Sequence, residues 1–108
     1  DDDAETETET AAAADLSGDW KITQTYSTGI SDTINVNITQ AGNNIGGSSS
    51  QGPLVGSISG KDLQFTITAK LDKVFKGVVI DDNLLAGTFE EQSSGSVVRE
   101  GSWVANRL

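Results

Sequence analysis

Gly18-Asp19-Trp20 and Gly101-Ser102-Trp103 are matching tripeptides at the two ends of a region built from short alternating segments. A first and a last strand that resemble each other favour a sheet that closes on itself, because closure removes both exposed edges. We therefore predict an all-β domain over residues 16–108, an eight-stranded antiparallel up-and-down barrel. A sandwich of two sheets is the structural alternative.

Alternation of apolar and polar residues with a period of two supports these strands. The pattern is clearest over residues 33–40 and 63–70. Turn residues break the chain near Thr28, Gly42, Gly52, Gly60, Asp72, Asp81 and Ser93, which leaves eight short segments. The residues predicted to face inward are Trp20, Ile22, Tyr26, Ile34, Val36, Ile38, Ile58, Leu63, Phe65, Ile67 and Trp103.

Two segments are harder to interpret. Residues 45–50 are rich in Gly and Ser, so they fit a bulged edge strand, a closing flap or a loop. The run Val78-Val79-Ile80 is apolar on both faces, which favours burial on both sides over an exposed patch.

The distribution of charged residues changes near residue 15. Residues 1–15 contain seven acidic residues and no base, so the net charge of −9 belongs mainly to this segment. Its small apolar content predicts a disordered acidic linker. The five lysines and two arginines are scattered over the remaining sequence, which argues against nucleic-acid binding.

Composition also bears on location. The chain has no Cys, His or Met and begins at Asp1, and no stretch approaches the ~20 apolar residues of a membrane span. A trimmed start, a polar spacer and a β-rich body are typical of an exported bacterial protein, so we expect a periplasmic, envelope-anchored or extracellular monomer. Such a spacer often follows a lipid-modified cysteine, so a membrane tether upstream of Asp1 is a hypothesis.

The residue types argue against an enzyme. Nucleophilic catalysis and soft-metal binding lack their usual His and Cys, and no Ser-x-x-Lys supplies a lysine base. Glu90 and Glu91 should point to opposite faces of a strand. Asp81-Asp82 fits a turn better than a calcium loop. We expect no cofactor and no metal site.

Leu16-Ser17-Gly18-Asp19-Trp20 resembles the Gly-x-Trp signature on the first strand of lipocalins and their calycin relatives. The chain is also similar to small secreted and lipoprotein barrels of bacteria. In lipocalins the Trp plugs one end of the barrel, and an Arg from near the end of the chain packs across its ring. The resemblance implies Arg107 for this role, with Arg99 second. Lipocalins are longer, however, and their lid loop and C-terminal helix are not recognisable here.

The same pentapeptide resembles the start of short bacterial metalloprotease-inhibitor barrels. In that family an N-terminal trunk enters the active cleft of the protease. Those inhibitors contain a disulfide, which this chain cannot form because it has no Cys.

These observations favour a binding role. We expect an exported, membrane-tethered barrel that binds a small apolar ligand or an envelope partner. A protease-inhibitor-like module and a structural envelope protein without a ligand are the alternatives. The interior should be largely filled, with Gly46, Gly56, Gly77 and Gly87 leaving room for a pocket on one wall. The candidate ligand-binding residues are Trp20, Gln24, Tyr26, Gln40, Phe65, Arg99 and Trp103.

Overall fold

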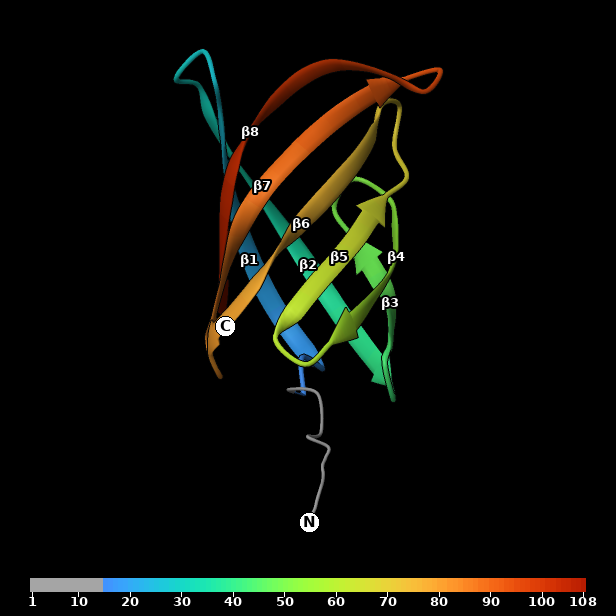
Figure 1. Cartoon of the computed structure of the whole chain (residues 1–108), viewed down its shortest axis with the longest axis vertical. Coiled ribbons are helices and arrows are strands. Elements are labelled where there is room, and N and C mark those ends of the chain that lie inside the picture. Colours follow the sequence, from blue (N-terminus) through green and yellow to red (C-terminus); the bar gives the residue numbers. More distant parts are fainter. Residues whose placement is uncertain (1–14) are drawn as a thin grey trace.

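Eight antiparallel strands form a closed barrel in the computed structural model, which describes residues 15–108 (Figure 1). The strands are β1 (Gly18–Tyr26), β2 (Ser31–Ala41), β3 (Asn44–Ser49), β4 (Pro53–Ser59), β5 (Asp62–Ile67), β6 (Asp72–Asp81), β7 (Leu84–Ser93) and β8 (Ser96–Arg107). Each strand pairs with the next along the chain, and β8 pairs with β1. The predicted up-and-down barrel is therefore confirmed, and the sandwich is excluded. Of the predicted linker, residues 1–14 lie outside the described residues.

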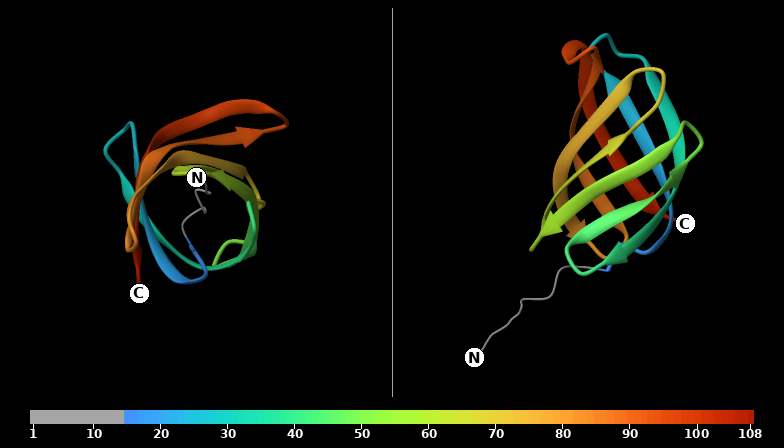
Figure 2. Two further views of the ribbon diagram at one scale, coloured as in Figure 1. Left: turned by 60° about the horizontal axis from the view of Figure 1, so that its bottom comes forward. Right: turned by 90° about the vertical axis from the view of Figure 1, so that its right-hand side faces the viewer.

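The pairing of β1 with β8 closes the barrel, and we call it the β1–β8 seam. It runs from Trp20 opposite Arg107 to Tyr26 opposite Gly101. The view toward one end of the barrel shows the strands forming an unbroken ring (Figure 2). The two ends of the domain that carry the tryptophans are thus neighbouring strands, as their matching sequences predict.

Aromatic side chains fill the middle of the barrel. Phe65 stacks on Phe75 with ring centroids 4.8 Å apart, and Phe75 stacks on Phe89 at 5.6 Å. Trp103 meets Phe65 and Phe75 edge-on, and its indole N–H donates to the main-chain carbonyls of Lys76 and Thr88. All of the residues predicted to face inward are buried, so alternation identified the core correctly.

Three of the four glycines predicted to leave a pocket instead make room for neighbouring strands and rings. A Cβ on Gly77 would lie 2.1 Å from the Ala86 carbonyl oxygen and 2.8 Å from Cζ2 of Trp103. A Cβ on Gly56 would lie 2.5 Å from Phe65, and one on Gly87 would lie 2.5 Å from Cα of Gly77. The predicted pocket at these positions is therefore wrong, because the space is occupied.

One end of the barrel is covered by Leu16, which is buried, and we call this the closed end. The Trp20 indole N–H donates to the Leu16 carbonyl oxygen at 2.8 Å, and the Leu16 N–H donates to Oε1 of Gln40 at 2.8 Å. The guanidinium of Arg107 lies 4.5 Å from the centre of the Trp20 ring. Arg107 also donates to the main-chain carbonyls of Ser17, Asp15 and Asp82. This arginine therefore ties the chain before β1 to the β6–β7 turn.

The structure corrects two local predictions and decides among the alternatives for a third. The Gly- and Ser-rich segment forms β3, a regular strand paired on both sides, and not a flap or loop. The break predicted at Asp72-Lys73 lies at residues 68–71, so Lys73 belongs to β6. Only Val79 of its apolar run is buried, while Val78 and Ile80 are 43% and 51% exposed. Burial on both sides is wrong because the outer face of the barrel is open to solvent.

The turn predicted at Asp81 is found in the structure. Asp81 accepts a hydrogen bond from the main-chain N–H of Asn83 at 2.8 Å, which is the turn role expected for it. Within residues 15–108, no helix is long and apolar enough to cross a membrane.

We predict that Trp20→Ala lowers the free energy of unfolding by about 3–5 kcal/mol, since it removes a fully buried indole. Lys21→Ala, on the exposed side of the same strand, is the control and should change it by less than about 0.5 kcal/mol. Urea unfolding followed by circular dichroism measures both. A loss below about 1 kcal/mol for the Trp20 variant would contradict this account of the closed end.

We also predict that Gly77→Ala destabilises the barrel by about 1–3 kcal/mol, because its Cβ has no room beside Trp103. Gly46→Ala is the matched control, since the nearest atom to its Cβ would be 3.6 Å away. Thermal unfolding of the two variants should separate them clearly. Equal melting temperatures would show that the strands near Gly77 relax at little cost.

Candidate functional site

The end of the barrel opposite Leu16 contains a cavity of about 630 Å³, which we call the open-end cavity. Residues of the β1–β2, β3–β4 and β5–β6 connections surround its entrance, among them Ile30, Gln51, Ala69 and Leu71. Its wall is therefore partly apolar. Tyr26, Lys73, Glu91 and Arg99 also line it.

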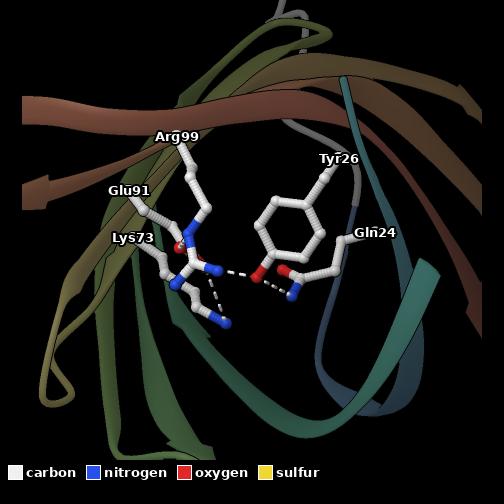
Figure 3. Close-up of polar contacts among 5 residues, drawn as sticks. All are labelled: Gln24, Tyr26, Lys73, Glu91 and Arg99. Carbon is white, nitrogen blue, oxygen red and sulfur yellow. Dashed lines mark hydrogen bonds and ion pairs between the residues drawn. The ribbon is translucent and has the colours of Figure 1, made fainter. Parts of the chain in front are cut away.

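Five polar side chains converge at this end of the barrel (Figure 3). We call Gln24, Tyr26, Lys73, Glu91 and Arg99 the floor cluster. The register places Lys73 opposite Glu91 and Glu91 opposite Arg99, so three charges form one row across β6, β7 and β8. Gln24 and Tyr26 are two residues apart on β1, and hence share its inner face.

Glu91 is the centre of the floor cluster, with its side chain only 2% exposed. Lys73 Nζ lies 3.3 Å from Oε2 of Glu91, and the Tyr26 hydroxyl donates to the same oxygen at 2.5 Å. Arg99 Nε lies 2.9 Å from Oε1, but this oxygen receives no hydrogen bond, so that contact is an ion pair alone. A buried carboxylate needs such partners, because its desolvation is otherwise costly.

The direction of the hydrogen bonds leaves one acceptor without a donor. The Tyr26 hydroxyl gives its proton to Glu91, so its oxygen accepts from Nε2 of Gln24 at 3.0 Å. Oε1 of Gln24 is then buried with no hydrogen-bond partner. Buried polar atoms of this kind are uncommon in folded proteins.

The Tyr26 ring connects the floor cluster to the core. The guanidinium of Arg99 lies 5.2 Å from the centre of its ring, and the Phe89 ring meets it edge-on at 5.3 Å. The pKa of Tyr26 is raised from its ordinary 10.0 to about 12, and burial of the hydroxyl is the largest cause. The hydrogen bond to Glu91 and the charges of Glu91 and Asp32 also contribute to this rise in pKa, whereas the charge of Arg99 opposes it.

The predicted ligand-binding residues lie in three separate places. Gln24, Tyr26 and Arg99 belong to the floor cluster. Phe65 and Trp103 lie in the aromatic core, where other rings surround them. Trp20 and Gln40 hold Leu16 at the closed end. Arg107 occupies the position over Trp20 that the lipocalin resemblance implies.

Sequence analysis missed two members of the floor cluster, Lys73 and Glu91. Continuing the alternation would have found both, since Lys73 has the facing of Phe75, and Glu91 that of Phe89. The break predicted at Asp72-Lys73 instead places Lys73 in a turn. The opposite facing of Glu90 and Glu91 is seen in the structure, where Glu91 is buried and Glu90 is partly exposed.

No protein-family model matches the chain, and no curated protein is significantly similar to it. Function must therefore be inferred from the site itself. Within the described part of the chain, no group of three or more His, Cys, Asp or Glu residues could hold a metal ion. The floor cluster holds two cationic side chains, Lys73 and Arg99, beside a partly apolar cavity.

We predict that Tyr26 titrates near pH 12, about two units above an ordinary tyrosine. The chain has one tyrosine, so tyrosinate absorbance reports on this residue alone. A pKa raised by folding stabilises the folded state fully below the unfolded pKa, and this contribution is lost as the pH rises through the folded pKa. The stability of the native chain should therefore fall between about pH 10 and pH 12.

Tyr26→Phe is the control for this prediction, because it keeps the ring and removes the titrating group. Its free energy of unfolding should fall less steeply over the same pH interval. An absorbance midpoint near 10 in the folded native chain would contradict the burial of this hydroxyl.

Proposed function

We propose that this chain is a lipocalin-like domain that binds a small, partly apolar molecule in the open-end cavity. The volume of about 630 Å³ lies within the range of small-molecule sites in proteins. Apolar side chains near the entrance, Ile30, Ala69 and Leu71, would contact the apolar part of the ligand. The floor cluster would contact a polar group.

The observation that carries this proposal is the buried charge of Glu91 with its partners Lys73 and Tyr26. Replacing a buried ion pair with packed apolar side chains is often neutral or stabilising. A barrel with only a structural role therefore gains little from charges here, whereas a binding site needs polar groups in fixed positions. The rest of the interior is apolar apart from Gln24, so polarity is confined to the end that has the cavity.

The lipocalin-like assignment draws support from the meander topology and from Arg107 over Trp20. Export and a membrane tether belong to the same proposal. They rest on the composition of residues 1–15. An interior filled by aromatic rings limits the ligand to the open-end cavity, so a molecule enclosed deep in the barrel is not proposed.

Isothermal titration calorimetry with octanol and octanoate tests the proposal. We expect saturable binding with one site per chain. Ala69→Trp should abolish it by filling the entrance, whereas Val78→Trp on the outer wall should leave it unchanged. Binding that survives Ala69→Trp would place the ligand elsewhere. If neither octanol nor octanoate binds, the proposal is refuted for apolar ligands of this size.

A further inference from the structure

We infer that the open-end cavity selects ligands that carry a single negative charge. This inference rests on the proposed function and concerns the class of ligand. Three cationic residues and two anionic residues line the cavity, so one positive charge is in excess. The charged residues are Asp32, Lys70, Lys73, Glu91 and Arg99.

The excess charge belongs to the floor of the cavity. Lys70 and Asp32 are exposed at the entrance, where solvent and salt weaken their fields. At the floor, the single negative charge of Glu91 faces the two positive charges of Lys73 and Arg99. Lys73 and Glu91 are buried there and balance each other, so the excess positive charge is that of Arg99, which lines the cavity 2.9 Å from Glu91.

Arg99 is available to a ligand because its side chain is 56% exposed while that of Glu91 beneath it is 2% exposed. Its N–H groups are not aligned with Oε1 of Glu91, although the ion pair is close. A guanidinium has five N–H donors in a planar fork that suits a carboxylate or similar anion. Glu91 thus holds Arg99 in place electrostatically and leaves its donors for another acceptor.

Charge balance then sets the preference. A monoanion neutralises the excess at the floor, whereas a neutral ligand leaves it uncompensated. A dianion would bring a further negative charge close to Glu91, and like charges in a poorly screened site are unfavourable. Selectivity arises both from the cations that attract and from the carboxylate that repels.

Three probes with the same alkyl chain test this by isothermal titration calorimetry: octanol, octanoate and octyl phosphate. At about pH 8 a phosphate monoester is mostly a dianion. We expect octanoate to bind about tenfold more tightly than octanol, as one added charge-assisted contact would give. Octyl phosphate should bind less tightly than octanoate.

Two substitutions change the charge at the floor in opposite directions. Glu91→Gln adds a second excess positive charge, so the order of octanoate and octyl phosphate should reverse. Arg99→Gln removes the excess, so the affinity for octanoate should fall to that for octanol. Because Arg99 is more than half exposed, its variant tests the inference even where Glu91→Gln fails to fold.

Lys61→Gln is the matched control, since it changes the net charge as Arg99→Gln does but lies in the β4–β5 turn at the closed end. It should leave all three affinities unchanged. Equal affinity of the native chain for octanol and octanoate would overturn the inference and leave the proposed function standing. If Lys61→Gln and Arg99→Gln change the affinities equally, the inference is also overturned and the proposed function still stands. If none of the three probes binds the native chain, the proposed function itself fails.

Discussion

The pairing of β1 with β8 is the interaction on which the rest of the structure depends. Without it, two long strands would present unpaired edges, which proteins avoid because such edges pair with other chains. The pairing also positions side chains at both ends of the barrel. At the closed end it sets Trp20 opposite Arg107, and at the open end it brings Tyr26 of β1 within reach of Arg99 on β8. The same β1–β8 register therefore creates the contact between Trp20 and Arg107 at the closed end and brings Tyr26 and Arg99 together in the floor cluster.

Much of the fold could be predicted from the sequence, because an antiparallel strand with one solvated face alternates residue by residue. Ile34, Val36 and Ile38 show the pattern clearly and are buried as expected. The candidate site was harder to predict. Lys73 and Glu91 interrupt the apolar pattern where strands meet connections, and a charge at such a place usually indicates solvent. Only the pairing of β6 with β7 shows that the two charges face each other inside the barrel.

The pocket predicted at Gly56, Gly77 and Gly87 was wrong for a related reason. A missing side chain on one strand indicates free space only if nothing from another strand fills it. At Gly77 and Gly56 the space is filled by Trp103 and Phe65, which come from strands β8 and β5. Sequence alone gives the size of each residue but not its neighbours across the barrel. The same aromatic residues that use this space leave the middle of the barrel full, so the ligand site that we propose lies at the end where aromatic packing stops.

The two ends of the barrel use the same pair of groups, an arginine over an aromatic ring, for different purposes. Arg107 lies over Trp20 and donates to three main-chain carbonyls, which satisfy it within the fold. Arg99 lies over Tyr26 beside a carboxylate to which it makes no aligned hydrogen bond. An arginine with three donors directed at the backbone stabilises a structure, and one that is held by charge with its donors available can recognise an anion. This contrast separates the closed end, which holds the barrel together, from the open end, where we expect the ligand.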